Sequence, residues 1–130
     1  MGGKIVSLKP FAIEMGLGVD LHGQDATKAA IKAVKNAVEH VSLPGMRQIA
    51  GVTDPDSQVY VDILLGVPAE LAARVDLEKV KAALPFGRRT ARLVPGGLLA
   101  SSGVALPSMG DTSDQAVAVV AALTVSLEVA

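Results

Sequence analysis

Residues 11–41, FAIEMGLGVD-LHGQD-ATKAAIKAVKNAVEHV, change their hydrophobic period once and so predict a strand followed by a helix. Over residues 11–20 large apolar side chains alternate with small or polar ones, which is the two-residue period of a strand. From residue 26 to about 41 the apolar positions recur at helical spacing, with lysines on the other side. Asp25 precedes the first of these positions and is expected to cap the helix.

The rest of the chain predicts three more strands and one more helix. The strand patterns cover residues 58–67, 88–94 and 116–129, and residues 98–106 are expected to extend an edge. A short helix opens at residue 76 and ends before Pro85. The order β-α-β-α-β-β predicts the α+β class: a two-layer sandwich with a mainly antiparallel four-stranded sheet and two helices on one face. We expect residues 1–130 to form a single domain.

The alternation also suggests which side chains the helices cover. We expect the covered face to carry Phe11, Ile13, Val59, Val61, Val117 and Val119. The opposite face would then carry Gly16, Gly18, Tyr60, Leu64, Ala118, Val120, Ala122 and Thr124. Such a face is too dry for permanent contact with water, which predicts a homo-oligomer. A trimer is favoured because chorismate-mutase-like folds of this topology form closed trimers with inward-facing sheets. An alanine-rich core in a monomer is the alternative explanation.

Composition argues against several classes of partner. Twelve basic and thirteen acidic residues give a net charge of −1, and aromatic residues make up 2% of the chain. We therefore expect neither nucleic acid nor a membrane surface as a partner. The absence of cysteine excludes disulfides and thiolate metal sites. We expect neither a signal peptide nor a membrane-spanning segment, because the sequence contains no apolar run of the required length. The sequence predicts a cytoplasmic protein without a cofactor, since Gly-x-Gly alone is not a dinucleotide signature.

Residues 16–25, GLGVDLHGQD, form the predicted site, at the junction between the first strand and the first helix. A helix that begins beside a glycine-rich turn offers free N–H groups and the positive end of its dipole. We expect His22 to be the proton carrier and Asp20 to orient it. The residues expected to bind a small-molecule substrate are Gly16, Gly18, Gly23, Gln24, Asp25, Lys28 and Asp111.

Simpler explanations exist for most of these residues. Asp25 as a cap alone satisfies capping preferences, and the glycines of the strand could serve close packing against another chain. His22 could be a structural hydrogen-bonding residue. A metal held by Asp20 and His22 would need ligands such as Asp111 or Asp114 from a second subunit, because the motif has one histidine and the chain has no thiols. No metal is predicted.

Residues 16–23, GLGVDLHG, fit the pattern GxGxDxHG and resemble a small family of conserved hypothetical bacterial proteins with plant relatives. Residues 24–30, residues 42–45 and the Gly110-Asp111 pair also look like that family, so the resemblance covers essentially the whole chain. It implies family membership and no known activity. The positions to which it carries a functional expectation are Gly16, Gly18, Asp20, His22 and Gly23, followed by Lys28 and Asp111.

Two functions fit these residues. In the first, His22 acts as general acid or base on a small polar or anionic molecule, in an isomerisation or the hydrolysis of a cyclic amide. In the second, the same loop binds a metabolite without catalysis, and the functional result of binding is the oligomeric assembly. His22→Asn separates them, because an enzyme would lose turnover and a binding protein would lose affinity.

Overall fold

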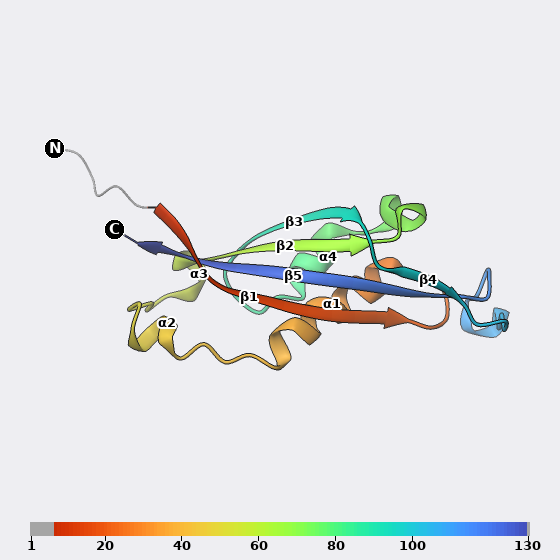
Figure 1. Cartoon of the computed structure of the whole chain (residues 1–130), viewed down its shortest axis with the longest axis horizontal. Helices are drawn as coiled ribbons and strands as arrows, with labels where there is room; N and C mark the ends of the chain where they lie inside the picture. Colours follow the sequence, from red (N-terminus) through yellow and green to blue (C-terminus); the bar gives the residue numbers. More distant parts are fainter. Residues whose placement is uncertain (1–6, 130) are drawn as a thin grey trace.

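The computed structural model describes residues 7–129 and confirms the two-layer α+β sandwich (Figure 1). Four strands lie in the order β1 (Ser7–Asp20), β5 (Gln115–Val129), β2 (Val59–Val67) and β3 (Arg88–Pro95). A fifth strand, β4 (Leu98–Ser101), pairs with the beginning of β5, along the same edge as β2 and beyond the point where β2 ends. The sheet is mainly antiparallel, and only β2 and β3 run parallel among the pairs in the described chain. The predicted four strands are thus joined by a short fifth.

The helices follow the predicted pattern with additional short turns. The long helix is α1 (Ala26–Glu39), and α4 (Leu77–Ala82) lies beside it within the crossover between parallel strands β2 and β3. Shorter turns are α2 (Gly45–Gln48), α3 (Pro55–Gln58), η1 (Ala69–Arg74) and η2 (Pro107–Met109). Asp25 caps α1 as predicted, with its side chain accepting from the Lys28 N–H at 3.0 Å. None of the helices in residues 7–129 is long and apolar enough to cross a membrane.

The core lies between α1, α4 and one face of the sheet, here called the covered face. The inward side chains of β2 and β5 are fully or almost fully buried there, as predicted for Val59, Val61, Val117 and Val119. The facing side of α1 is made of small residues: Ala26, Ala29, Ala30, Ala33, Val34 and Ala37. Small side chains on the helix bring its backbone close to the sheet.

The predicted orientation of β1 is wrong. Gly16 and Gly18 lie on the covered face, while Ile13 projects from the other face and is 68% exposed. A Cβ atom added at Gly18 would lie only 1.9 Å from the carbonyl oxygen of Ala29 in α1. Alternation separates the two faces of a strand without saying which one is covered. Here α1 packs against the face on which Gly16 and Gly18 leave room for its backbone.

Phe11, also expected on the covered face, lies at a bulge in β1. The register with β5 shifts between Pro10 and Ala12, so Phe11 is the extra residue of the strand. Its side chain is 40% exposed, and its ring tip lies near Gly45 at the start of α2. The bulge therefore removes this aromatic ring from the core under α1.

The opposite face of the sheet, here called the open face, carries a stripe of large apolar side chains. Met15 and Leu17 of β1 are 66% and 53% exposed. Leu17 pairs with Val120 of β5, and Leu98 of β4 lies one row further along, opposite Ala118. Nothing in residues 7–129 covers these side chains, so the open face is more apolar than the sequence predicted.

Candidate functional site

Two loops meet at one end of the sheet, where β1 ends and β5 begins. Asp20 at the end of β1 pairs with Val117 near the start of β5. The antiparallel register therefore places the loop of residues 21–25 beside the loop of residues 102–114, which links β4 to β5 (Figure 1). The predicted motif and Asp111 come together in this way although 89 positions separate His22 from Asp111.

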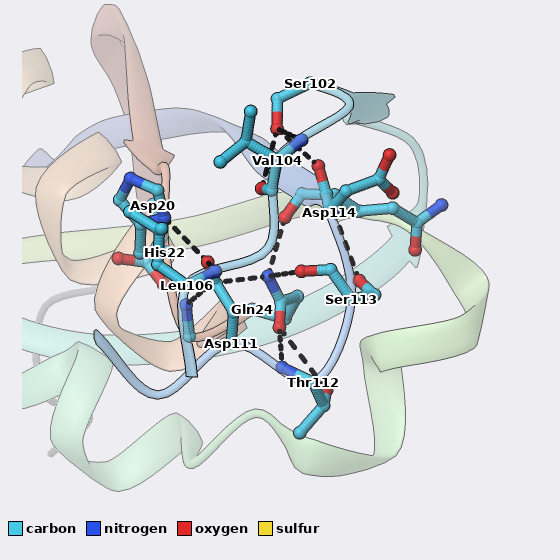
Figure 2. Close-up of polar contacts among 12 residues, drawn as sticks. Asp20, His22, Gln24, Ser102, Val104, Leu106, Asp111, Thr112, Ser113 and Asp114 are labelled. Carbon is cyan, nitrogen blue, oxygen red and sulfur yellow. Dashed lines mark hydrogen bonds and ion pairs between the residues drawn. The ribbon is translucent and has the colours of Figure 1, made fainter. Parts of the chain in front are cut away.

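The carboxylate of Asp111 is the centre of this junction (Figure 2). It accepts hydrogen bonds from the N–H of Gly23 at 2.7 Å, the N–H of Leu106 at 2.8 Å, Nδ1 of His22 at 2.8 Å and Nε2 of Gln24 at 3.0 Å. The Leu106 N–H first, then the His22 ring and the Gly23 N–H, hold the pKa of Asp111 well below its usual range. Asp111 is therefore ionised and acts only as an acceptor.

His22 has one occupied and one open ring nitrogen. Because ionised Asp111 only accepts, the hydrogen between them belongs to Nδ1 of His22. In the tautomer that this bond fixes, Nε2 is the nitrogen that can take up a proton. Within residues 7–129 this Nε2 atom has no hydrogen-bond partner, and the side chain is 29% exposed. His22 lines a surface groove of about 430 Å³. The other residues lining the groove are Val19, Asp20, Leu21, Lys28, Lys32 and Met109.

Asp111, rather than Asp20 as predicted, forms the hydrogen bond to His22. Asp20 continues the two-residue period of Gly18 and turns under the beginning of α1, where its side chain is 4% exposed. One carboxylate oxygen accepts from the N–H of Asp25 at 2.9 Å, and the other lies 4.0 Å from Nζ of Lys28. Asp20 therefore anchors the loop to the helix and lies close to one lysine of the groove.

Gln24 and Asp25 serve the loop itself. Gln24 is 8% exposed and has a φ of 50°, a left-handed conformation that is uncommon outside glycine. Its amide donates to the carbonyl of Gln115 at 2.8 Å and accepts from the N–H of Thr112 at 3.0 Å, so it joins the two loops. The Asp25 N–H, expected to hold a substrate anion, is already bound to Asp20.

Gly23 takes the positive φ of 94° that the turn requires. Gly16 and Gly18, in contrast, lie beneath α1 and do not line the groove. Lys28 does line it, together with Lys32, which sequence reasoning assigned to the solvated face of the helix. Their i, i+4 spacing was the available signal, because it places both ammonium groups on the same side of α1.

Lys32 is also tied to the end of β1, since its Nζ donates to the carbonyl of Val19 at 3.0 Å. Among the described side chains, no group of three or more His, Asp or Glu is placed to hold a metal ion. The groove thus combines an open imidazole nitrogen, two ammonium groups and one carboxylate within a small area.

A family model described as "Conserved hypothetical protein (Lin0512_fam)" matches residues 10–125. The chain belongs to this family. It is also similar to a crystal structure described as an FtsZ-like protein of unknown function from Nostoc punctiforme PCC 73102. The two share 38% sequence identity with a TM-score of 0.83, over 95% of this chain and 99% of that one. No curated protein matches the chain. The family resemblance of the sequence is confirmed, and no reaction comes with it.

Proposed function

We propose that this protein is an enzyme in which Nε2 of His22 moves protons to and from a small polar or anionic substrate in the groove. The observation that carries the proposal is the 2.8 Å hydrogen bond between His22 Nδ1 and buried Asp111, which leaves Nε2 as an open base. A carboxylate that fixes the tautomer and orientation of an imidazole also stabilises the imidazolium that forms when the ring takes a proton.

The charges around His22 favour an anionic substrate. Lys28 and Lys32 line the same groove, and Asp20 is the one acidic side chain in its lining. The Lys28 side chain is 61% exposed, so its field is partly screened and its role is attraction and orientation. We assign substrate binding to these lysines in place of the Asp25 amide.

Two reactions suit this arrangement. In the hydrolysis of a cyclic amide, Nε2 takes a proton from water as the oxygen adds to the carbonyl carbon. The imidazolium returns that proton to the amide nitrogen as the C–N bond breaks. In an isomerisation, Nε2 removes a proton next to a carbonyl group and returns it to another atom of the same substrate. Both cycles leave His22 neutral and need no further reactant except, for the first, water.

The test is turnover of small anionic ring amides, such as dihydroorotate and pyroglutamate, and of small keto acids. We expect His22→Asn to lower kcat about a hundred-fold or more while ligand affinity persists. His40→Asn is the matched control because His40 lies at the other end of α1, as its C-cap. Loss of affinity without any turnover to lose would instead indicate the alternative, a metabolite-binding protein. Equal turnover in both variants would refute the role of His22.

We also propose that the open face is covered by further copies of this chain, with a trimer as the expected assembly. The observation behind this is the stripe that includes Ile13, Met15, Leu17 and Leu98, all more than half exposed. The net charge of −1 produces little repulsion between copies. We expect this assembly to be located in the cytoplasm, as predicted from the sequence.

Light scattering after gel filtration tests the assembly. Leu17→Lys should shift the protein to the monomer mass, because it places a charge in the middle of the stripe. Ile49→Lys is the control, since Ile49 is 87% exposed at the end of α2 and away from the sheet. A wild-type chain that stays monomeric at high concentration would refute the proposal.

A further inference from the structure

A second cavity, of about 500 Å³, lies at the opposite end of α1 from the His22 groove. The sheet continues past the last turn of the helix, and the chain after α1 closes over it. Apolar side chains form most of the wall, among them Val38, Leu43, Met46, Val52, Phe86 and Val125. The two cavities share no residue. A volume of this size with mainly apolar walls is typical of a small-molecule site.

Glu14 of β1 lines this cavity and is the unusual group in it. Its side chain lies on the covered face, two positions before Gly16, where the backbone of α1 no longer shields the strand. Glu14 is 7% exposed, yet within residues 7–129 it has neither a hydrogen-bond donor nor an ion-pair partner. The Glu14 oxygens are not among the fully enclosed unpaired atoms of residues 7–129, so the carboxylate is reached from the cavity, and burial of the side chain raises its pKa.

No basic side chain among the described residues forms an ion pair with Glu14. The last turn of α1 contains no basic residue, so the negative end of the helix dipole near Val38 and Val41 is uncompensated. Arg47 is the basic residue in the lining, and it belongs to the exposed short helix α2. A second carboxylate in this cavity would be repelled, whereas a cation would be attracted by both Glu14 and the helix end.

We propose that this cavity binds a small apolar molecule that carries a protonated amine, with Glu14 as its counter-ion. The apolar body would occupy the space between α1, α2 and the sheet, and the ammonium group would donate to the Glu14 carboxylate at the floor. This site is separate from the proposed chemistry at His22 and does not depend on it.

Calorimetry with 2-phenylethylamine tests the assignment, with 2-phenylethanol as the neutral probe of similar shape and phenylacetate as the anionic one. We expect the amine to bind the wild-type protein most tightly and phenylacetate most weakly. Glu14→Gln, which keeps the size and removes the charge, should weaken amine binding about tenfold or more while the alcohol binds as before. Equal affinities of amine and alcohol for the wild type, or an unchanged amine affinity in the variant, would overturn the proposal.

Two more variants locate the binding. Val41→Trp fills the cavity from a partly exposed position, so it should abolish amine binding without disturbing the buried core. Lys28→Ala alters the other groove and should leave amine binding unchanged. Arg47→Ala should leave it nearly unchanged as well. An increase of tenfold or more in Arg47→Ala would show that Arg47 neutralises Glu14 in the free protein, which would overturn the assignment to an amine ligand.

Discussion

Gly18→Ala should be among the most destabilising single substitutions in this protein. The added Cβ atom would lie 1.9 Å from the carbonyl oxygen and 3.0 Å from the carbonyl carbon of Ala29, and 2.4 Å from the amide nitrogen of Ala33. All three atoms belong to the backbone of α1, so no side chain can turn away to make room. The helix must move as a unit or the strand must shift.

The size of the effect follows from these distances. Since Cβ contacts under 3.0 Å are essentially never seen, α1 must move away from β1 by at least about 1.1 Å. That movement opens the contact between the alanine face of α1 and the sheet along its whole length. We expect a loss of about 3 kcal/mol in the free energy of unfolding, at the upper end of overpacking effects. For a domain of this size, this corresponds to roughly 10 °C in Tm.

Urea and thermal unfolding of wild type, Gly18→Ala and Gly66→Ala provide the assay. Gly66 is the matched control because it also lies within a strand, β2, and a Cβ atom there would be 3.6 Å from its nearest neighbours. We expect Gly66→Ala to change stability by less than about 1 kcal/mol, since alanine also restricts the unfolded chain. If the two variants unfold within about 0.5 kcal/mol of each other, the close contact of α1 and β1 is not what Gly18 serves.

Three further predictions concern the loops at the end of the sheet. The pKa of Asp111 is lowered in the folded protein, so its carboxylate stabilises the fold at pH values above 3.8, the ordinary pKa of an aspartate. This stabilisation is lost as the pH falls below 3.8. Wild type should therefore exceed Asp111→Asn in urea stability near pH 7, with a difference that shrinks in acid; a pH-independent difference would contradict this. Asp25→Ala should lower the free energy of unfolding by about 1 kcal/mol, measured by thermal unfolding, because α1 loses its N-cap. Asp25→Asn should keep most of this stability, since asparagine also caps helices. Diethyl pyrocarbonate should modify His22 in the His40→Asn variant, as measured by mass spectrometry, and a protein left unmodified would show that Nε2 is not open.

Much of the fold could be predicted because its signals are local. The change of period around residue 25 marks the end of β1 and the start of α1, and the caps at Asp25 and Asp76 need only neighbouring residues. The orientation of β1 could not be found in this way. The sequence alone suggests that Gly16 and Gly18 leave space for a ligand or for another chain. In the structure the backbone of α1 from the same chain occupies that space. Which element approaches a bare strand face is decided by tertiary packing.

The candidate site was predictable in its position and only partly in its contacts. The motif of residues 16–25 pointed to the loop that the structure places beside Asp111 and the groove of Lys28 and Lys32, and its role as a functional site stays a prediction. The partner of His22 depends on the register of β5 against β1, which brings Asp111 to the ring. Asp20, only two positions away, points under α1 instead, since the strand period continues through it. The carboxylate closest to His22 in the sequence is therefore not the one that contacts its ring in the structure.

The close contact between α1 and β1 connects the two proposed sites. At the beginning of the helix it places Lys28 and Lys32 beside the end of β1, where His22 opens into the groove. At its end the helix stops before it covers Glu14, which leaves the second cavity. Both sites therefore depend on the same distance between helix and strand. Gly18→Ala, studied at a temperature where it remains folded, should weaken amine binding and slow turnover together, whereas Gly66→Ala should change neither. If Gly18→Ala impaired one site alone, the two ends of α1 would have to move independently, and the helix would not be the rigid element that positions both.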